Sequence, residues 1–278
     1  MTPPIRLLAI DIDGTLLDAK SQVPEANLAA LRRAYAGGIE IVLTTGRRHS
    51  FALPIAESLG FGLWLISSNG AITKSIGGEV FHRDLLPSAV ARRLVDHMRP
   101  FQRHAVLTFD QETRGALVLE SAEELHASIA RWMEKNAEFI ERVGDLEQAL
   151  STDPIQVMYC GRIDRMRQAE SHLLSGSIAG EVTLLKTEYE ARNLCILDVM
   201  NRDCSKGHAL KRWAKHRGIT RQQIVAIGDN YNDIEMLEFA GIPVIMENAS
   251  PQLKRSGWRV TLSNEQSGVA AALQELGI

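Results

Sequence analysis

Two aspartates separated by a single residue, Asp11 and Asp13, are the side chains of this sequence best suited to covalent chemistry. They follow the largely apolar run Ile5–Ile10, which predicts a strand buried on both faces of a parallel sheet. Ligands of such sheets bind beyond the carboxyl ends of the strands, where both aspartates lie. There Asp11 can attack a phosphorus atom, while Asp13 donates a proton to the leaving alkoxide and later accepts one from water. The alternative is a solvated turn, because Asp and Gly are common turn residues.

A second polar segment, Thr44–Arg47, follows the predicted strand Ile39–Leu43. A hydroxyl and backbone N–H groups at the carboxyl end of a strand suit a phosphate oxygen. Thr45 is the better donor, because the adjacent Gly46 lets the backbone approach a ligand closely. Taken alone, this segment also fits an ordinary loop.

The segment Ser205–Gly207 opens a predicted helix, with Ser205 as its N-cap. A lysine in the first turn, Lys206, has the wrong sign for the helix dipole, which favours anions there. A shared anionic ligand resolves this conflict, because the helix N-terminus and Lys206 can then bind one phosphate.

A fourth segment, Gly228–Asp233, lies directly after the predicted strand Ile224–Ile227. Mg²⁺ prefers oxygen ligands in a near-octahedral shell, and Asp229 can provide a carboxylate opposite Asp11. The alternative is the start of a helix, capped by Asp or Asn and acidic in its first turn. Asp233 fits that alternative, or orients its neighbours.

Strands and helices alternate in the first and last thirds of the chain, which predicts an α/β fold with a doubly wound parallel sheet. The expected strands are the three named above together with Leu63–Ile66 and Ile242–Ile245. One expected helix is bracketed by Pro24 and Gly37-Gly38, and the others are Phe51–Leu59, Lys206–His216, Asp233–Phe239 and Ser267–Leu276.

The middle of the chain has hairpin spacing and predicts an inserted α+β domain. Its expected strands are Val106–Phe109, Ala116–Glu120, Ile155–Cys160 and Val182–Leu185, and its expected helices are Ser121–Asn136 and Arg162–Leu174. The predicted division is a core domain of residues 1–84 and 194–278 and an insert of residues 85–193.

Composition narrows the functional classes. The 278 residues are 45% hydrophobic and 23% charged with a formal net charge of -3, and no basic block suggests nucleic-acid binding. Three widely spaced cysteines argue against a disulfide framework or a zinc knuckle. The first residues do not resemble a secretory signal, and no apolar run is long enough to span a bilayer. We therefore expect a cytoplasmic protein without a nucleic-acid or membrane partner; its oligomeric state stays open.

The motifs together resemble the haloacid dehalogenase (HAD) superfamily, and more closely its Cof-type (type IIB, C2-capped) sugar-phosphatase branch. They occur in order as DIDGT at Asp11–Thr15, TTGR at Thr44–Arg47, NGA at Asn69–Ala71, SKG at Ser205–Gly207 and GDNYND at Gly228–Asp233. The ending VTLSNEQSGVA, Val260–Ala270, is also similar to that branch.

The resemblance implies a Rossmann-like core with a C2-type cap and a phosphatase that hydrolyses sugar phosphates or similar small metabolites with Mg²⁺. It implies an aspartyl-phosphate on Asp11, with Asp13 as acid and base and Lys206 as a further catalytic residue. The metal would be held by Asp11, Asp13 through its carbonyl, and Asp229. The phosphate would be bound by Ile12 through its backbone and by Thr45, Gly46, Lys206 and Asn232.

The sequence departs from the branch at Glu247, where the branch commonly has glycine, and this leaves the conformation of that loop open. Two alternatives also stay open: a phosphomutase on the same fold, and a non-catalytic protein that binds a metabolite. We expect the insert to determine substrate choice, although it carries no readable motif. Asn69 and Arg47 are possible helpers in the site.

Overall fold

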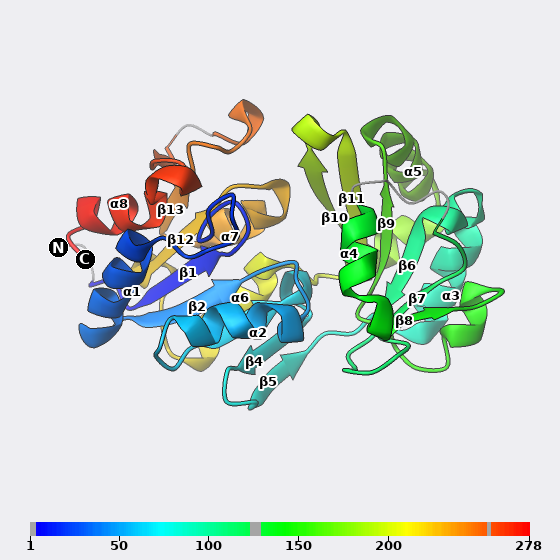
Figure 1. The fold of residues 1–278 in the computed structure, drawn as a ribbon, viewed down its shortest axis with the longest axis horizontal. Coiled ribbons are helices and arrows are strands. Elements are labelled where there is room, and N and C mark those ends of the chain that lie inside the picture. Colours follow the sequence, from blue (N-terminus) through cyan, green and yellow to red (C-terminus); the bar gives the residue numbers. More distant parts are fainter. Residues whose placement is uncertain (1–3, 123–128, 255–256) are drawn as a thin grey trace. The chain divides into compact units, whose positions relative to one another are not determined.

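The structure, a computed structural model, describes residues 4–122, 129–254 and 257–278 (Figure 1). The chain forms two compact units. The core unit contains the residues up to Arg83 together with Ser205–Ile278, and the inserted unit contains Asp84–Cys204. The inserted unit is longer at its end than the predicted limit of 193, because Leu194–Asn201 pairs with two strands of that unit.

An eight-stranded sheet forms the centre of the core unit, in the order β14-β13-β12-β1-β2-β3-β4-β5. The strands from β14 to β3 are parallel, which is the predicted doubly wound arrangement, and β4 and β5 add an antiparallel hairpin that was not predicted. The bounds are β1 Leu7–Asp11, β2 Glu40–Thr44, β3 Trp64–Ser67, β4 Ile72–Ser75, β5 Val80–Arg83, β12 Ile224–Gly228, β13 Ile242–Ile245 and β14 Arg259–Val260.

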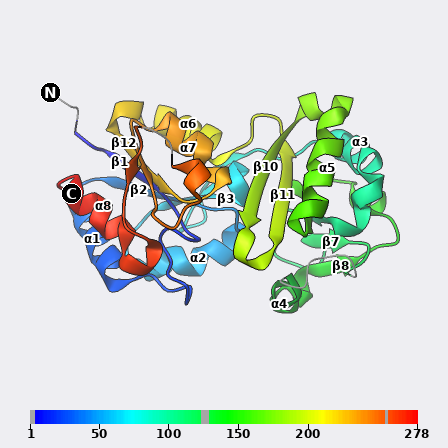
Figure 2. The ribbon, with the colours of Figure 1, turned by 90° about the horizontal axis from the view of Figure 1, so that it is seen from above.

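Helices cover both faces of this sheet (Figure 2). Alternate side chains of β1 therefore enter different apolar clusters, Leu8 and Ile10 on one face and Leu7 and Ala9 on the other. Burying each large side chain contributes about 1.5–3 kcal/mol, which is why β1 is apolar up to Asp11. The helices are α1 Glu25–Ala36, α2 His49–Ser58, α6 Lys206–His216, α7 Ile234–Phe239 and α8 Gly268–Glu275.

The inserted unit contains a six-stranded sheet in the order β10-β11-β9-β6-β7-β8. Helices α3 and α5 pack on one face and α4 on the other. The predicted hairpin is confirmed as the antiparallel pair β6–β7, whereas residues 123–128 of the predicted helix Ser121–Asn136 lie outside the described residues. The bounds are α3 Ser88–His97, β6 Ala105–Thr108, β7 Leu117–Leu119, α4 Ala130–Lys135, β8 Ile140–Arg142, β9 Gln156–Gly161, α5 Ile163–Ser175, β10 Val182–Tyr189 and β11 Leu194–Asn201.

Two further expectations concern the cysteines and the membrane. All three cysteines are free and buried. Within the described ranges, no helix has both the length and the apolar character needed to cross a bilayer.

Candidate active site

The carboxyl ends of the parallel core strands bring the predicted residues to one edge of the sheet. Asp11, the last residue of β1, pairs in register with Thr44, the last residue of β2. On the other side Ile10 pairs with Ile227, so Gly228 and the segment after it lie level with Asp11. This register confirms that the Asp11 and Asp229 segments share one edge.

Lys206 connects three distant parts of the sequence. Its Nζ lies 2.6 Å from Oδ1 of Asp11 and 2.7 Å from Oδ1 of Asp233, and its side chain is 1% exposed. Ser205 is the N-cap of α6, as predicted, and accepts a hydrogen bond from the His208 N–H at 3.1 Å. Burial alone would lower the pKa of Lys206, but the two carboxylates outweigh it and raise the pKa above its usual value. The lysine is therefore held as a cation beside Asp11.

Three carboxylates gather around this lysine, from Asp11, Asp229 and Asp233, with ligand oxygens within 4.8 Å of one another. Burial, followed by the charge of Asp233, raises the pKa of Asp229 to about 7, although Thr15 donates a hydrogen bond to Asp229 at 2.8 Å. Burial and the neighbouring Asp233 also raise the pKa of Asp11. One lysine thus leaves the cluster with excess negative charge.

This cluster fits a divalent cation. Oxygen donors and an excess of negative charge suit a hard cation. Burial first, and then repulsion between the carboxylates, raises the pKa of Asp11 and of Asp229, and a bound cation would offset both effects. Both carboxylate oxygens of Asp233 already accept hydrogen bonds within the protein. Its Oδ1 accepts from Lys206, and its Oδ2 accepts from the N–H groups of Asp229 and Asn230 at 3.0 and 3.1 Å. Asp11 and Asp229 are therefore the better candidates for metal ligands.

The predicted phosphate-binding residues Thr45, Gly46 and Asn232 are brought together through Asn69. The amide of Asn232 donates to Oδ1 of Asn69 at 2.9 Å, and a Cβ on Gly46 would lie 3.1 Å from the same oxygen. The N–H of Thr45 instead donates to the carbonyl of Ile66 at 2.9 Å. The expectation that the Thr45 backbone would approach a ligand is therefore wrong for its N–H, and its hydroxyl is the group left to donate.

Asp13 has a different environment from Asp11. Its carboxylate accepts two hydrogen bonds from Arg47, at 2.8 and 2.5 Å, and its side chain is 45% exposed. The turn directly after Asp13 needs Gly14, which has a φ of +82° and lies against Asp229. A Cβ at Gly14 would come within 2.5 Å of Oδ2 of Asp229, so the loop and the acidic cluster depend on each other.

The sequence left the role of Asp233 open between a helix start and an orienting residue, and it missed Thr15. In the structure Asp233 does both: its side chain binds Lys206 and the N–H groups at the start of the segment. Thr15, the last residue of DIDGT, lies against Asp229. Both residues belong to recognised motifs, but contacts between motifs are not readable from spacing within one motif.

The loop at Glu247 is unstrained. Glu247 does not have a positive φ, so glycine is not required there, and its carboxylate pairs with Lys254 at 3.2 Å. The next residue, Asn248, donates to the carbonyl of Gly14 at 2.8 Å and accepts from the N–H of Asn264. This loop therefore supports the turn after Asp11 through Asn248.

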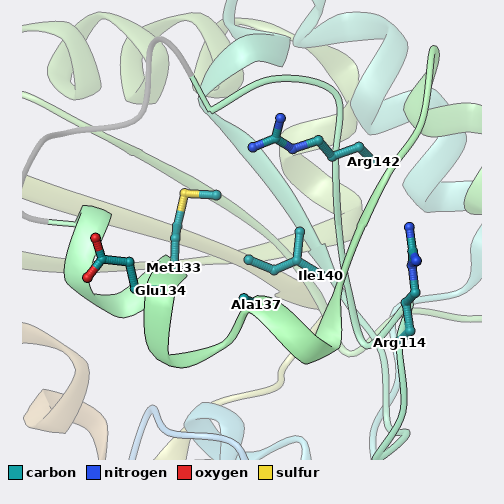
Figure 3. A pocket seen from close by; sticks show the side chains of 6 residues that line it. All are labelled: Arg114, Met133, Glu134, Ala137, Ile140 and Arg142. Carbon is teal, nitrogen blue, oxygen red and sulfur yellow. The ribbon is translucent and has the colours of Figure 1, made fainter.

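The inserted unit contains a cavity of about 390 Å³ that the sequence did not predict (Figure 3). Its lining combines two arginines and a glutamate with an apolar floor, from Arg114, Met133, Glu134, Ala137, Ile140 and Arg142. All of these lining residues come from the part of the chain that runs from the β6–β7 turn to β8, in which the sequence shows no motif.

The haloacid dehalogenase-like hydrolase family matches residues 8–273 of the chain. The chain belongs to this family. It is 32% identical over 291 residues to Phosphatase YwpJ of Bacillus subtilis (strain 168), with 98% of this chain and 100% of that protein covered. It is 30% identical over 248 residues to HMP-PP phosphatase of Enterobacter sp. (strain 638), with 89% of this chain and 86% of that protein covered.

Among solved structures, this HAD-like hydrolase matches the HAD subclass IIB sugar phosphatase BT4131 with a TM-score of 0.78 and 22% identity, over 98% of this chain and 99% of that one. That likeness concerns the fold. The predicted family and fold are confirmed, and the chain is an enzyme of the hydrolase class whose relatives are named phosphatases.

Proposed function

We propose that the chain is a Mg²⁺-dependent phosphatase that hydrolyses small phosphomonoesters through an aspartyl-phosphate on Asp11. The observation that carries this proposal is the contact of Lys206 with Asp11 inside a buried, acid-rich cluster at the carboxyl edge of the sheet. A nucleophilic carboxylate, a fixed cation and candidate metal ligands are the parts that phosphoryl transfer needs, because its catalysis rests on positioning and charge stabilisation.

Asp11 acts as the nucleophile. Lys206 holds Oδ1 of Asp11, which leaves Oδ2 to attack phosphorus while the bond from phosphorus to the ester oxygen breaks. Burial and the surrounding carboxylates raise the pKa of Asp11, and the ammonium of Lys206 opposes that shift. The contact with Lys206 therefore favours the ionised, nucleophilic form.

Asp13 moves the protons. In the first step its protonated carboxyl gives a proton to the departing alkoxide, so the alcohol leaves neutral. In the second step Asp13 takes a proton from a water molecule, whose oxygen attacks phosphorus and releases orthophosphate and the free carboxylate of Asp11. Because Arg47 holds both oxygens of Asp13, this role requires Arg47 to give up at least one of its two hydrogen bonds. The partial exposure of Asp13 gives water access to it.

The phosphate group is held by Ile12 through its backbone, by Thr45 and Gly46, and by Lys206 and Asn232. Asp11, Asp229 and the carbonyl of Asp13 hold Mg²⁺, which when bound neutralises charge on the carboxylates and on the phosphoryl oxygens. Asp233 keeps Lys206 and the segment that starts at Asp229 in place through its hydrogen bonds.

The substrate class follows from the relatives and the chemistry together. The relatives include a phosphatase named for HMP-PP, and a structural neighbour is named a sugar phosphatase, so substrates vary within this fold. The groups proposed around Asp11 bind the phosphate group and not the rest of the substrate. This supports a small phosphorylated metabolite, including sugar phosphates, as the substrate of this chain.

The test is release of orthophosphate from a broad panel of phosphate esters, with and without Mg²⁺, by the wild-type protein and by Asp11→Asn. We expect metal-dependent turnover by the wild type and a loss of at least about 10⁴-fold in Asp11→Asn, as for other removed nucleophiles. Glu170→Gln, an acid of the inserted unit, is the matched control and should retain activity. Turnover retained in Asp11→Asn would rule out the nucleophile.

A further inference from the structure

Three consecutive residues between β3 and β4 have backbone conformations that residues other than glycine rarely adopt. Ser68, Asn69 and Gly70 have φ values of 48°, 53° and 108°. Ser68 and Asn69 are 2% and 1% exposed, so this strained turn is also fully packed. Strained backbone persists only where its surroundings hold it, and it is concentrated at functional sites.

Each residue of this Ser68–Gly70 turn contacts the segments that the proposed function assigns to phosphate. The N–H groups of Ser68 and Asn69 donate to the carbonyls of Arg47 and Thr45 at 2.8 and 2.9 Å. A Cβ on Gly70 would clash with the carbonyl oxygen of Ser205, directly before Lys206. The backbone of the turn thus joins the Thr45 loop to the start of α6.

The side chain of Asn69 adds the remaining segment. Its Oδ1 accepts the hydrogen bond of Asn232 at 2.9 Å and lies beside the α-carbon of Gly46. The left-handed conformation of Asn69 directs this side chain between the two segments, and asparagine is among the few residues that adopt it at low cost.

We propose that Asn69 is a positioning residue of the phosphate site, which orients the amide of Asn232 against the Thr45–Gly46 loop. This inference rests on the proposed function for the role of that site, but not on turnover. Asn69 acts through Asn232, because its own carbonyl oxygen is occupied by the amide of Asn232.

The test is direct titration of inorganic phosphate by calorimetry, together with steady-state kinetics on an ester that the wild type hydrolyses. Asn69→Gly keeps the positive φ and removes only the side chain, so the fold is retained. We expect the dissociation constant for phosphate and the KM to rise together by about tenfold, the effect of one lost hydrogen bond, with kcat changed by less than about threefold.

The matched control is Asn193→Gly, which removes an asparagine with a φ of 49° from the turn between β10 and β11 of the inserted unit. It should change neither constant. In addition, Asn232→Ala should weaken phosphate binding in the wild type but add less than about twofold to Asn69→Gly, because the two residues act as one unit. Phosphate binding by Asn69→Gly equal to that of the wild type, additive effects of the two substitutions, or no phosphate binding by the wild type would each overturn the inference. Absent ester turnover with the expected pattern of phosphate binding would instead refute the proposed function and leave the inference supported.

Discussion

Among the residues that the structure describes, two lysines lie between two carboxylates, and one of these two is in the candidate active site. Lys206 of the core unit is 1% exposed and lies 2.6 and 2.7 Å from its two acids. Lys186 of the inserted unit is 28% exposed and lies 3.4 and 3.7 Å from Glu170 and Glu188. The two clusters also differ in charge balance, because the cluster of Lys186 has a second base: Arg167 pairs with Glu188 at 3.7 Å.

The comparison indicates what distinguishes a reactive cluster from a structural one. Around Lys186 two acids are matched by two bases, so the charges are balanced. Glu188 is only 7% exposed, but its partners Lys186 and Arg167 are 28% and 64% exposed, so solvent screens part of the cluster. Around Lys206 three buried or partly buried acids face one base, and burial together with the repulsion from Asp233 raises the pKa of Asp11 and of Asp229. Unbalanced buried negative charge costs stability, and a bound cation would relieve it.

The largest expected difference between the two clusters comes from removing each lysine. Lys206→Met should lower the free energy of unfolding by about 3 kcal/mol, because it leaves buried carboxylates without a partner, whereas Lys186→Met should change it by less than about 1 kcal/mol. Lys206→Met should also reduce phosphate release by at least about 100-fold, as the loss of a fixed charge at a reacting group does. Urea denaturation and the phosphatase assay measure both effects. Similar losses in the two variants would contradict the distinction between a reactive cluster at Lys206 and a structural one at Lys186.

A smaller effect is expected in the dependence of stability on pH. The pKa of Asp229 is raised to about 7 in the folded protein, from about 4 in the unfolded chain. Between these values the folded state holds a proton that the unfolded state has released, so stability falls as the pH rises. We therefore expect the metal-free protein to unfold at a higher urea concentration at pH 5 than at pH 7.5.

Comparison with variants isolates this contribution from that of the histidines. Asp229→Asn should reduce the difference between the two pH values, and Mg²⁺ should reduce it in the wild type, because a bound cation favours ionised Asp229. Asp164→Asn is the control: this exposed aspartate has a pKa lowered mainly by the N–H of Arg165, so it titrates below the tested range. An unchanged difference in Asp229→Asn would contradict the assigned pKa of that residue.

The core unit was largely predictable because its sequence patterns are local. The strand β13 and the helix α6 have the predicted bounds. A short apolar run defines β13, and α6 is delimited by Ser205 before it and Gly218 after it. The hairpin β4–β5 was missed because β5, with residues Val80–Arg83, is a half-exposed edge strand without a continuous apolar pattern.

The contacts between segments were less predictable than the segments. The family resemblance predicted that Asp11 and Lys206 belong to one phosphate site, but nothing in the sequence showed that Arg47 would pair with Asp13 or that Asn69 would accept a hydrogen bond from Asn232. These contacts depend on side-chain directions that the tertiary structure decides. The limit at 193 was wrong for the same reason: Leu194–Asn201 is apolar enough for either unit, and only its pairing with β9 and β10 assigns it.

The smallest expected effect concerns Glu247, the residue that departs from the family pattern. Among the described residues Glu247 forms a further ion pair with a lysine, Lys254, with exposed fractions of 24% for the lysine and 58% for the glutamate. Glu247→Gly should lower the free energy of unfolding by about 0.5–1 kcal/mol, because glycine gains freedom in the unfolded chain and an exposed ion pair contributes little. Glu247→Ala, which loses the same pair without that freedom, should cost less. Both variants should keep phosphate release within about twofold, since the support for the Asp11 turn comes from Asn248. A tenfold change in activity in either variant would mean that Glu247 contributes to the active site, as Lys206 does, and not only to stability, as Lys186 does.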